Sequence, residues 1–162
     1  MSLTTPPPSD VPLPPVLAEI AEDLEALPAA QRLEMLVELG ASVRAVPEPY
    51  ASDTGLMEQV VECQSPVFVA VELEPADPPS SGRVTLHVSA PKEAPTTRGF
   101  AGVLTEGLEG MDASEVLAVP ADLPARLGLP ELVSPLRVAG MTSLLGRVQR
   151  QVRERLDDGR AS

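Results

Sequence analysis

Residues 83–89 read RVTLHVS, a stretch in which apolar and polar side chains alternate without interruption. A period of two is typical of a β-strand with one buried face. We therefore expect Val84, Leu86 and Val88 to point into a core, and the residues between them, His87 included, to face outward.

Two further strands are predicted upstream of this one. The valine-rich run at 67–73 also alternates, and the turn-rich loop EPADPPSSG at 74–82 joins it to the strand at 83–89. Residues 56–62 predict a third strand. Because the connections are short, we expect an antiparallel sheet, unlike the parallel sheet of nucleotide-binding folds.

Helical patterns lie on both sides of the predicted sheet. Apolar residues recur with helical spacing over 16–27 and again over 28–43, so two helices open the domain. A third helix is predicted over 97–110, a capping box at 112–115, and a final helix after Ser134-Pro135. The predicted fold class is α+β: a small three-stranded antiparallel sheet packed against helices, with two N-terminal helices and a long C-terminal helix.

The length and composition indicate a single domain. The chain has 162 residues, 43% of them hydrophobic, which is enough for one compact core. We place this domain at 16–156. Residues 1–15, MSLTTPPPSDVPLPP, are rich in Pro, Ser and Thr and are expected to form a disordered arm, and residues 157–162 a flexible tail.

The charge of the chain argues against two classes of partner. A formal net charge of −12 repels phosphate backbones and anionic lipid headgroups, so we expect no nucleic acid and no membrane partner. The sequence contains no apolar run of membrane-spanning length, and its start lacks the features of a secretory signal. Together with the lone cysteine, which allows no internal disulfide, these features indicate a cytoplasmic protein.

Several chemistries find no support in the sequence. A structural zinc or iron–sulfur site takes about four soft or imidazole ligands, and Cys63 and His87 are the only cysteine and histidine. His87, on the polar face of its strand, is expected to be a solvated surface side chain. No phosphate loop is indicated, because the glycines that follow the sheet are spread along a helix, where they are expected to permit close packing; they are Gly99, Gly102, Gly107 and Gly110.

Cys63 leaves two interpretations open. A lone cytoplasmic cysteine is often a small buried hydrophobe. Here, however, it follows the predicted strand at 56–62 and precedes Gln64-Ser65-Pro66, so we expect it at the tip of a loop, where functional residues concentrate. A reactive thiol is the second interpretation.

Four segments resemble the SufE family, the sulfur-accepting accessory proteins of cysteine desulfurases. ECQSPVFV, at 62–69, is similar to the family's G-C-Q-S-Q-V-W-like motif. MLVELG, at 35–40, resembles its I-I-E-L-G stretch, and TTRGFAGVL, at 96–104, resembles its Lys-Gly-containing helix. PLRVAGMTSLLGRV, at 135–148, resembles the S-R-x-x-G-L start of its last helix.

The resemblance implies a function for two residues and a set of partners. Cys63 would accept sulfur as a persulfide from a SufS-like cysteine desulfurase, and a downstream SufBCD-like assembly complex would receive it for iron–sulfur clusters. Arg137 matches the family's characteristic arginine and would contact the loop or the partner, although the pattern alone favours an ordinary surface arginine. The resemblance implies no enzyme activity and no cofactor for this chain, because pyridoxal phosphate belongs to the desulfurase.

Two other functions stay open at this point. A non-covalent regulatory adaptor of a desulfurase would not need the thiol, and a single-cysteine redox sensor would use it against peroxide. The chain also departs from the family motif, because Glu62 replaces the glycine before the cysteine. Glu62 is expected to disfavour the thiolate, whereas Arg137 or Arg98, if close, would favour it.

Overall fold

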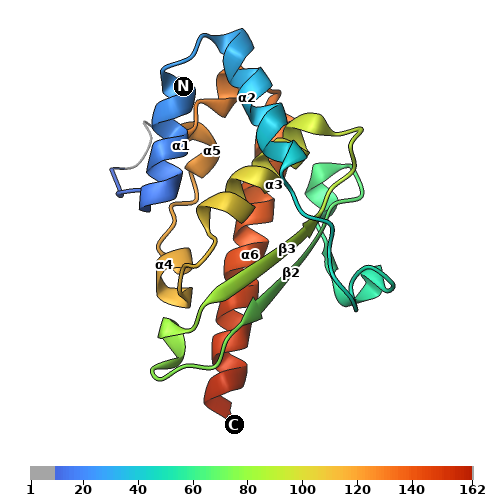
Figure 1. Ribbon diagram of the computed structural model, residues 1–162, viewed down its shortest axis with the longest axis vertical. Helices are drawn as coiled ribbons and strands as arrows, with labels where there is room; N and C mark the ends of the chain where they lie inside the picture. Colours follow the sequence, from blue (N-terminus) through green and yellow to red (C-terminus); the bar gives the residue numbers. More distant parts are fainter. Residues whose placement is uncertain (1–9, 162) are drawn as a thin grey trace, which may run out of the picture.

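The computed structural model describes residues 10–161 and confirms the α+β class. A three-stranded antiparallel sheet in the order β1-β2-β3 lies among the helices (Figure 1). The helices are α1 (Pro15–Glu25), α2 (Ala29–Ala41), α3 (Pro95–Gly107), α4 (Ala113–Leu117), α5 (Leu123–Arg126) and α6 (Pro135–Ala161). The strands are β1 (Glu58–Gln59), β2 (Phe68–Leu73) and β3 (Val84–Ser89), and the 3-10 turns are η1 (Thr54–Leu56), η2 (Val61–Cys63), η3 (Pro79–Ser81) and η4 (Leu129–Glu131).

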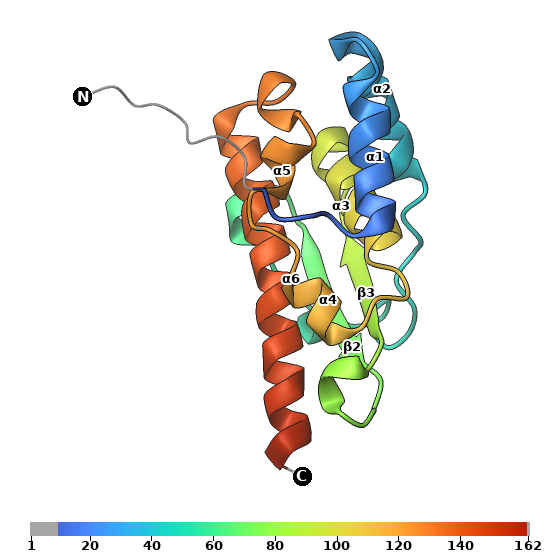
Figure 2. The same cartoon turned by 90° about the vertical axis from the view of Figure 1, so that its left-hand side faces the viewer.

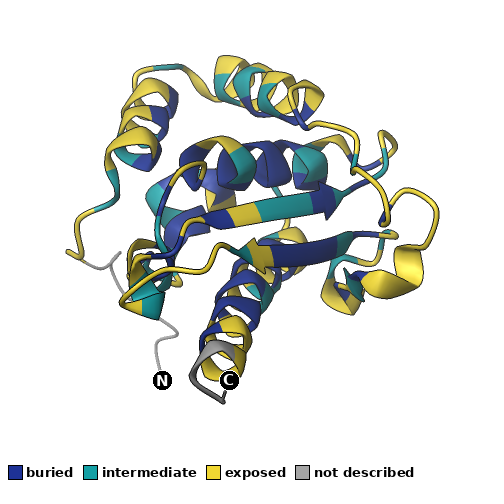
Figure 3. Ribbon diagram, turned by 60° about the horizontal axis from the view of Figure 1, so that its bottom comes forward, coloured by how far each residue is buried: buried dark blue, intermediate teal, exposed yellow. Residues whose placement is uncertain are grey.

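The long helix α6 lies at the centre of the hydrophobic core and contacts most other elements. It runs beside the sheet along the length of the molecule (Figure 2), and its buried positions (Figure 3) meet β2, η2 and the helices α3, α4 and α5. Val69 and Val71 of β2 are fully buried there. Apolar residues that recur with helical spacing along α6 are likewise buried, at Met141, Leu144, Leu145, Val148 and Val152, whereas Leu136 in its first turn is exposed.

Strand β1 is much shorter than the predicted strand at 56–62. Only two of its residues pair with β2, and η1 and η2 flank them. The physical reason lies in α6, whose side chains take over the edge of β2 where a longer strand would pair. Gln151 accepts a hydrogen bond from the Val71 N–H at 2.9 Å, and Arg155 donates to the Val71 carbonyl at 3.2 Å. The edge of β2 is thus satisfied without a full strand.

The glycines of α3 allow it to touch α2, as predicted. A Cβ on Gly99 would lie 2.4 Å from the Leu36 carbonyl oxygen, and one on Gly102 would lie 2.1 Å from that of Leu39. Both distances are far shorter than any real contact, so only glycine permits this crossing. The prediction is wrong for Gly110, which has nothing within 4 Å and instead takes a positive φ of 78° after the helix.

The outer face of the sheet is not the solvated surface that the sequence predicts. The connection after α2 folds back over it, so that Tyr50 and Met57 are buried against Ala70. The ring of Tyr50 lies 5.1 Å from that of His87, and Glu72 accepts a hydrogen bond from the Tyr50 hydroxyl at 3.0 Å. His87 is therefore largely covered, and the expectation of a solvated histidine is wrong.

Both ends of the described chain differ from the predicted arm and tail. Residues 10–14 contact the domain, because Leu13 packs on the core and the Val11 carbonyl accepts a hydrogen bond from Arg126 at 2.8 Å. The rest of the predicted arm, residues 1–9, lies outside the described residues. The predicted tail continues α6 as far as Ala161, since no proline interrupts the helix beyond the buried Leu156. Across residues 10–161, no helix has the length and apolarity needed to cross a membrane.

Candidate functional site

Cys63 lies in a short loop, residues 60–67, which we call the cysteine loop. Its two ends are fixed, because Val60 and Val67 are fully buried and the Val60 N–H donates to the Val67 carbonyl at 2.8 Å. Between them the chain turns through η2 and reverses at Gln64, whose φ of 56° is left-handed. The structure therefore places Cys63 in a surface loop with a rigid base, as the sequence predicts.

The cysteine loop contacts α6 at Gly140. The Cys63 thiol donates a long hydrogen bond of 3.5 Å to the Gly140 carbonyl. A Cβ on residue 140 would lie 3.1 Å from the Cys63 Cα and 3.3 Å from its Sγ, which is tighter than ordinary van der Waals contact. The absence of a side chain at this position thus lets the loop rest directly on the helix and leaves the thiol half-buried.

The surroundings of Cys63 keep its thiol protonated. Burial raises the pKa of Cys63 most, the negative charge of Glu62 raises it further, and the positive charge of Arg147 lowers it. The result is a pKa of about 11 instead of the ordinary 9.0. Since the thiolate is the nucleophile, the thiol in this conformation is almost unreactive at neutral pH.

Arg147 links the cysteine loop to α6 by charge. Its Nη2 donates to both carboxylate oxygens of Glu62, at 2.7 and 2.8 Å, and its Nη1 donates to Glu58. The hydrogen bond from Arg147 holds the pKa of the Glu62 carboxyl below its ordinary value, so the pair is ionised at neutral pH. Arg150 also donates to Glu58, and to Glu154.

Arg147 was not identified from the sequence. A weak signal exists, because it follows Gly140 by seven residues and thus lies on the same face of α6. Its partner Glu62, however, is 85 residues away in the chain, and no helical or strand period relates the two. Only the packing of the loop against α6 brings them together.

Arg137 and Arg98, which were expected to favour the thiolate if they lay close to it, have other partners. Arg137, exposed in the first turn of α6, donates from Nη1 to the Thr96 hydroxyl at 2.8 Å. Arg98 donates from Nε to the Gly40 carbonyl at 3.0 Å and also to the Ala90 carbonyl, so it joins α2, α3 and the end of β3. The arginine whose charge acts on Cys63 is Arg147.

One exposed apolar side chain lies within the cysteine loop, and another lies one helical turn before Gly140 on α6. Val61, within η2, is 62% exposed, and Leu136 is 55% exposed. Leu136 precedes Gly140 by one helical turn, so it lies on the face of α6 that carries the loop. Solvent-exposed apolar side chains beside a thiol are suited to contact with another protein.

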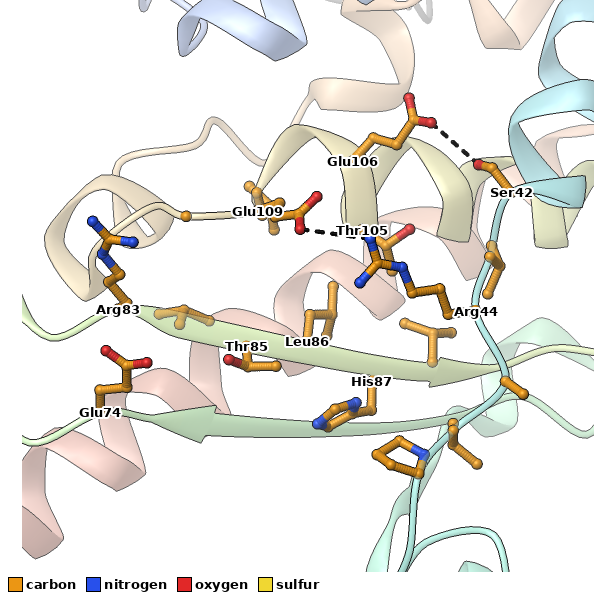
Figure 4. A pocket seen from close by; sticks show the side chains of 18 residues that line it. Ser42, Arg44, Glu74, Arg83, Thr85, Leu86, His87, Thr105, Glu106 and Glu109 are labelled. Carbon is orange, nitrogen blue, oxygen red and sulfur yellow. Dashed lines mark hydrogen bonds and ion pairs between the residues drawn. The ribbon is translucent and has the colours of Figure 1, made fainter.

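A groove of about 690 Å³ lies elsewhere, along the edge of β3 (Figure 4). Its lining residues come from β3, the loop between β2 and β3, the end of α3 and the connection after α2, and none belongs to the cysteine loop or α6. Two of its charged groups face each other, since Arg44 lies 3.9 Å from Glu109, and Glu106 accepts a hydrogen bond from the Ser42 hydroxyl. Within residues 10–161, no three Cys, His, Asp or Glu side chains gather where they could hold a metal.

Comparisons with known proteins agree on one family. The model of the SufE family, described as the Fe-S metabolism associated domain, matches residues 18–152. Uncharacterized SufE-like proteins from two strains of Mycobacterium tuberculosis are 45% identical over 142 residues, which is 88% of this chain and 94% of theirs. The solution structure of a hypothetical protein from Thermus thermophilus is 38% identical, with a TM-score of 0.75 over 90% of this chain and 99% of that one.

The raised pKa predicts how the free protein reacts with an alkylating agent. The rate of Cys63 alkylation by iodoacetamide should rise about tenfold per pH unit from neutral pH to beyond pH 9, because the thiolate fraction keeps growing until the pKa near 11 is reached. Intact mass measures the rate cleanly, since the chain has one cysteine, and Cys63→Ser serves as the unlabelled control. If the alkylation rate reached a plateau below pH 9, the pKa of the Cys63 thiol would not be raised.

Proposed function

The chain belongs to the SufE family, and on that premise we propose that it is a sulfur carrier for iron–sulfur cluster assembly. Cys63 takes the persulfide sulfur from a SufS-like cysteine desulfurase and hands it to a SufBCD-like assembly complex. The observation that carries this proposal is the position of the only cysteine: it lies in a surface loop with a fixed base, beside exposed apolar side chains. A merely structural cysteine needs none of these features.

The proposed step is a thiol exchange at sulfur. The Cys63 thiolate attacks the terminal sulfur of a cysteine persulfide on the desulfurase. A new sulfur–sulfur bond forms to the Cys63 Sγ while the one in the desulfurase breaks, so the desulfurase cysteine leaves as a thiolate and Cys63 becomes the persulfide. Atoms and electrons balance without an external oxidant or reductant.

The lone cysteine suits a carrier. A second thiol nearby could attack the persulfide, release sulfide and leave an internal disulfide. Cys63 is the only cysteine in the chain, so this loss cannot occur within one molecule. The same count argues against a cluster scaffold, which needs several cysteine ligands.

The position of Cys63 against Gly140 requires a conformational change during sulfur transfer. In the free protein the thiol is half-buried and protonated, so it must leave this half-buried position, which we call the recess, before it can attack. A desulfurase that contacts Val61 and Leu136 touches both the loop and the helix on which the loop lies. We infer that docking on these two residues releases the thiol from Gly140.

The half-buried, protonated thiol differs from the thiol of a typical redox sensor. Sensor cysteines are low-pKa, accessible thiolates with a resolving cysteine often close by. Cys63 has the opposite properties, with a pKa of about 11 and a half-buried side chain. The adaptor function is not separated in this way and requires an experiment.

The acceptor and the adaptor differ in their need for sulfur chemistry. If Cys63 accepts sulfur, the protein should accelerate cysteine turnover by its desulfurase, and Cys63→Ser should lose that acceleration while still binding the enzyme. Sulfide release with a reductant present measures turnover, and calorimetry measures binding. Undiminished acceleration by Cys63→Ser would establish the adaptor and exclude the acceptor.

The apolar rim predicts a second effect. Leu136→Asp should weaken binding to the desulfurase by about tenfold or more, because it places a charge on an apolar contact that becomes buried. Leu56→Asp is the matched control, because Leu56 is similarly exposed, at 53%. Leu56 lines the same small pocket as Arg155. Arg155 follows Gly140 by 15 residues, which is about 22 Å along α6. Equal weakening by both variants would argue against a docking surface at Leu136.

A further inference from the structure

The cysteine loop is joined to α6 by two polar side-chain contacts among the described residues. One is the long hydrogen bond from Cys63 to the Gly140 carbonyl. The other is the ion pair of Glu62 with Arg147. The base of the loop is buried, whereas Val61, Glu62 and the residues beyond Cys63 are mostly exposed. Apolar packing of Cys63 on the core also holds the loop tip, but the polar contacts that hold it on α6 are these two.

We propose that the Glu62–Arg147 ion pair is a latch that holds the cysteine loop on α6 and thereby sets how readily the Cys63 thiol leaves its recess. Glu62 immediately precedes Cys63, so a movement of the loop backbone that lifts the thiol from Gly140 also moves the carboxylate away from Arg147. Both residues are positioning residues, because they act on the thiol through the loop. The inference rests on the proposed function, since uptake of sulfur is the step that the latch would control.

The bonding of Arg147 explains why this arginine can hold the loop. Its Nε is buried without a hydrogen-bond partner, so its bonds run through the two Nη atoms to Glu58 and Glu62. Glu58 belongs to β1, which pairs with β2, and therefore fixes the guanidinium relative to the sheet. The Glu62 carboxylate then docks on a cation that is already in place.

The latch is also weak enough to open. The Glu62 side chain is 40% exposed and that of Arg147 is 23% exposed. Ion pairs with an exposed member are screened by water and salt and contribute little to overall stability. The Cys63–Gly140 hydrogen bond, at 3.5 Å to a sulfur donor, is weak as well. The loop tip can therefore leave α6 while its buried base stays in the core.

The Arg147→Gln variant distinguishes a latch from a purely electrostatic effect. The positive charge of Arg147 lowers the pKa of Cys63, so its loss alone would slow alkylation. Loss of a latch would instead speed alkylation, because the thiol leaves the recess more often. We expect iodoacetamide to modify Cys63 of Arg147→Gln at least about threefold faster than wild type at neutral pH, the scale of a partly exposed ion pair. An unchanged or slower rate would overturn the proposal.

Three variants control for other consequences of this change. Arg150→Gln also loses a bond to Glu58 but none to Glu62, so its rate should match wild type. Arg147→Lys should restore much of the slow rate, because a lysine can still pair with Glu62. In a Glu62→Ala background no latch remains, so adding Arg147→Gln should now slow alkylation. Acceleration that persists in that background, or appears equally in Arg150→Gln, would refute the latch.

A second measurement applies if Arg147→Gln loses its fold by circular dichroism. Amide hydrogen exchange at residues 61–64 should then be faster in Glu62→Ala than in Glu154→Ala, whose carboxylate binds Arg150 instead of Arg147. Equal exchange in the two variants would refute the latch. All these rates are measured on the free protein, so they test the latch independently of whether Cys63 accepts sulfur.

Discussion

Because residue 140 has no side chain, the cysteine loop can lie directly on α6, and this contact fixes the chemistry of the site. Helix α6 is fixed in the core, since Met141, Leu144 and Val148 are fully buried and the helix contacts β2. The loop cannot shift at its base, since its two ends are buried in the same core. The thiol therefore lies half-buried beside Gly140.

The charges around the recess work in two directions. Arg147 favours the thiolate by its charge, yet it binds Glu62 and so holds the loop where burial disfavours the thiolate. Burial and Glu62 outweigh Arg147 in the seated loop, and the pKa of Cys63 rises to about 11. In solvent the burial contribution disappears, so the same residue becomes a far better nucleophile. Position, more than any fixed neighbour, decides the reactivity of this thiol.

Local patterns explain how much of this could be predicted from the sequence. The alternation at 83–89 predicts β3, and Asp112 with Glu115 forms the predicted capping box, because both signals arise from neighbours in the chain. The loop position of Cys63 follows from the turn residues beside it. Other contacts join segments that are distant in the chain. They are the ion pair of Arg147 with Glu62, the hydrogen bond of Gln151 at the edge of β2, and the packing of Tyr50 against His87. No local period encodes such contacts, so they emerge only from the packed structure.

The most direct test of the carrier function is the mass of the chain after incubation with cysteine and a SufS-like desulfurase. Peptide mass then locates any added atom. A sulfur carrier should gain one additional sulfur on the peptide that contains Cys63, removable by a reductant, and absent both from Cys63→Ser and from a mixture without the desulfurase. A chain that gains no sulfur while it still accelerates the desulfurase would contradict the account and identify the protein as a non-covalent adaptor.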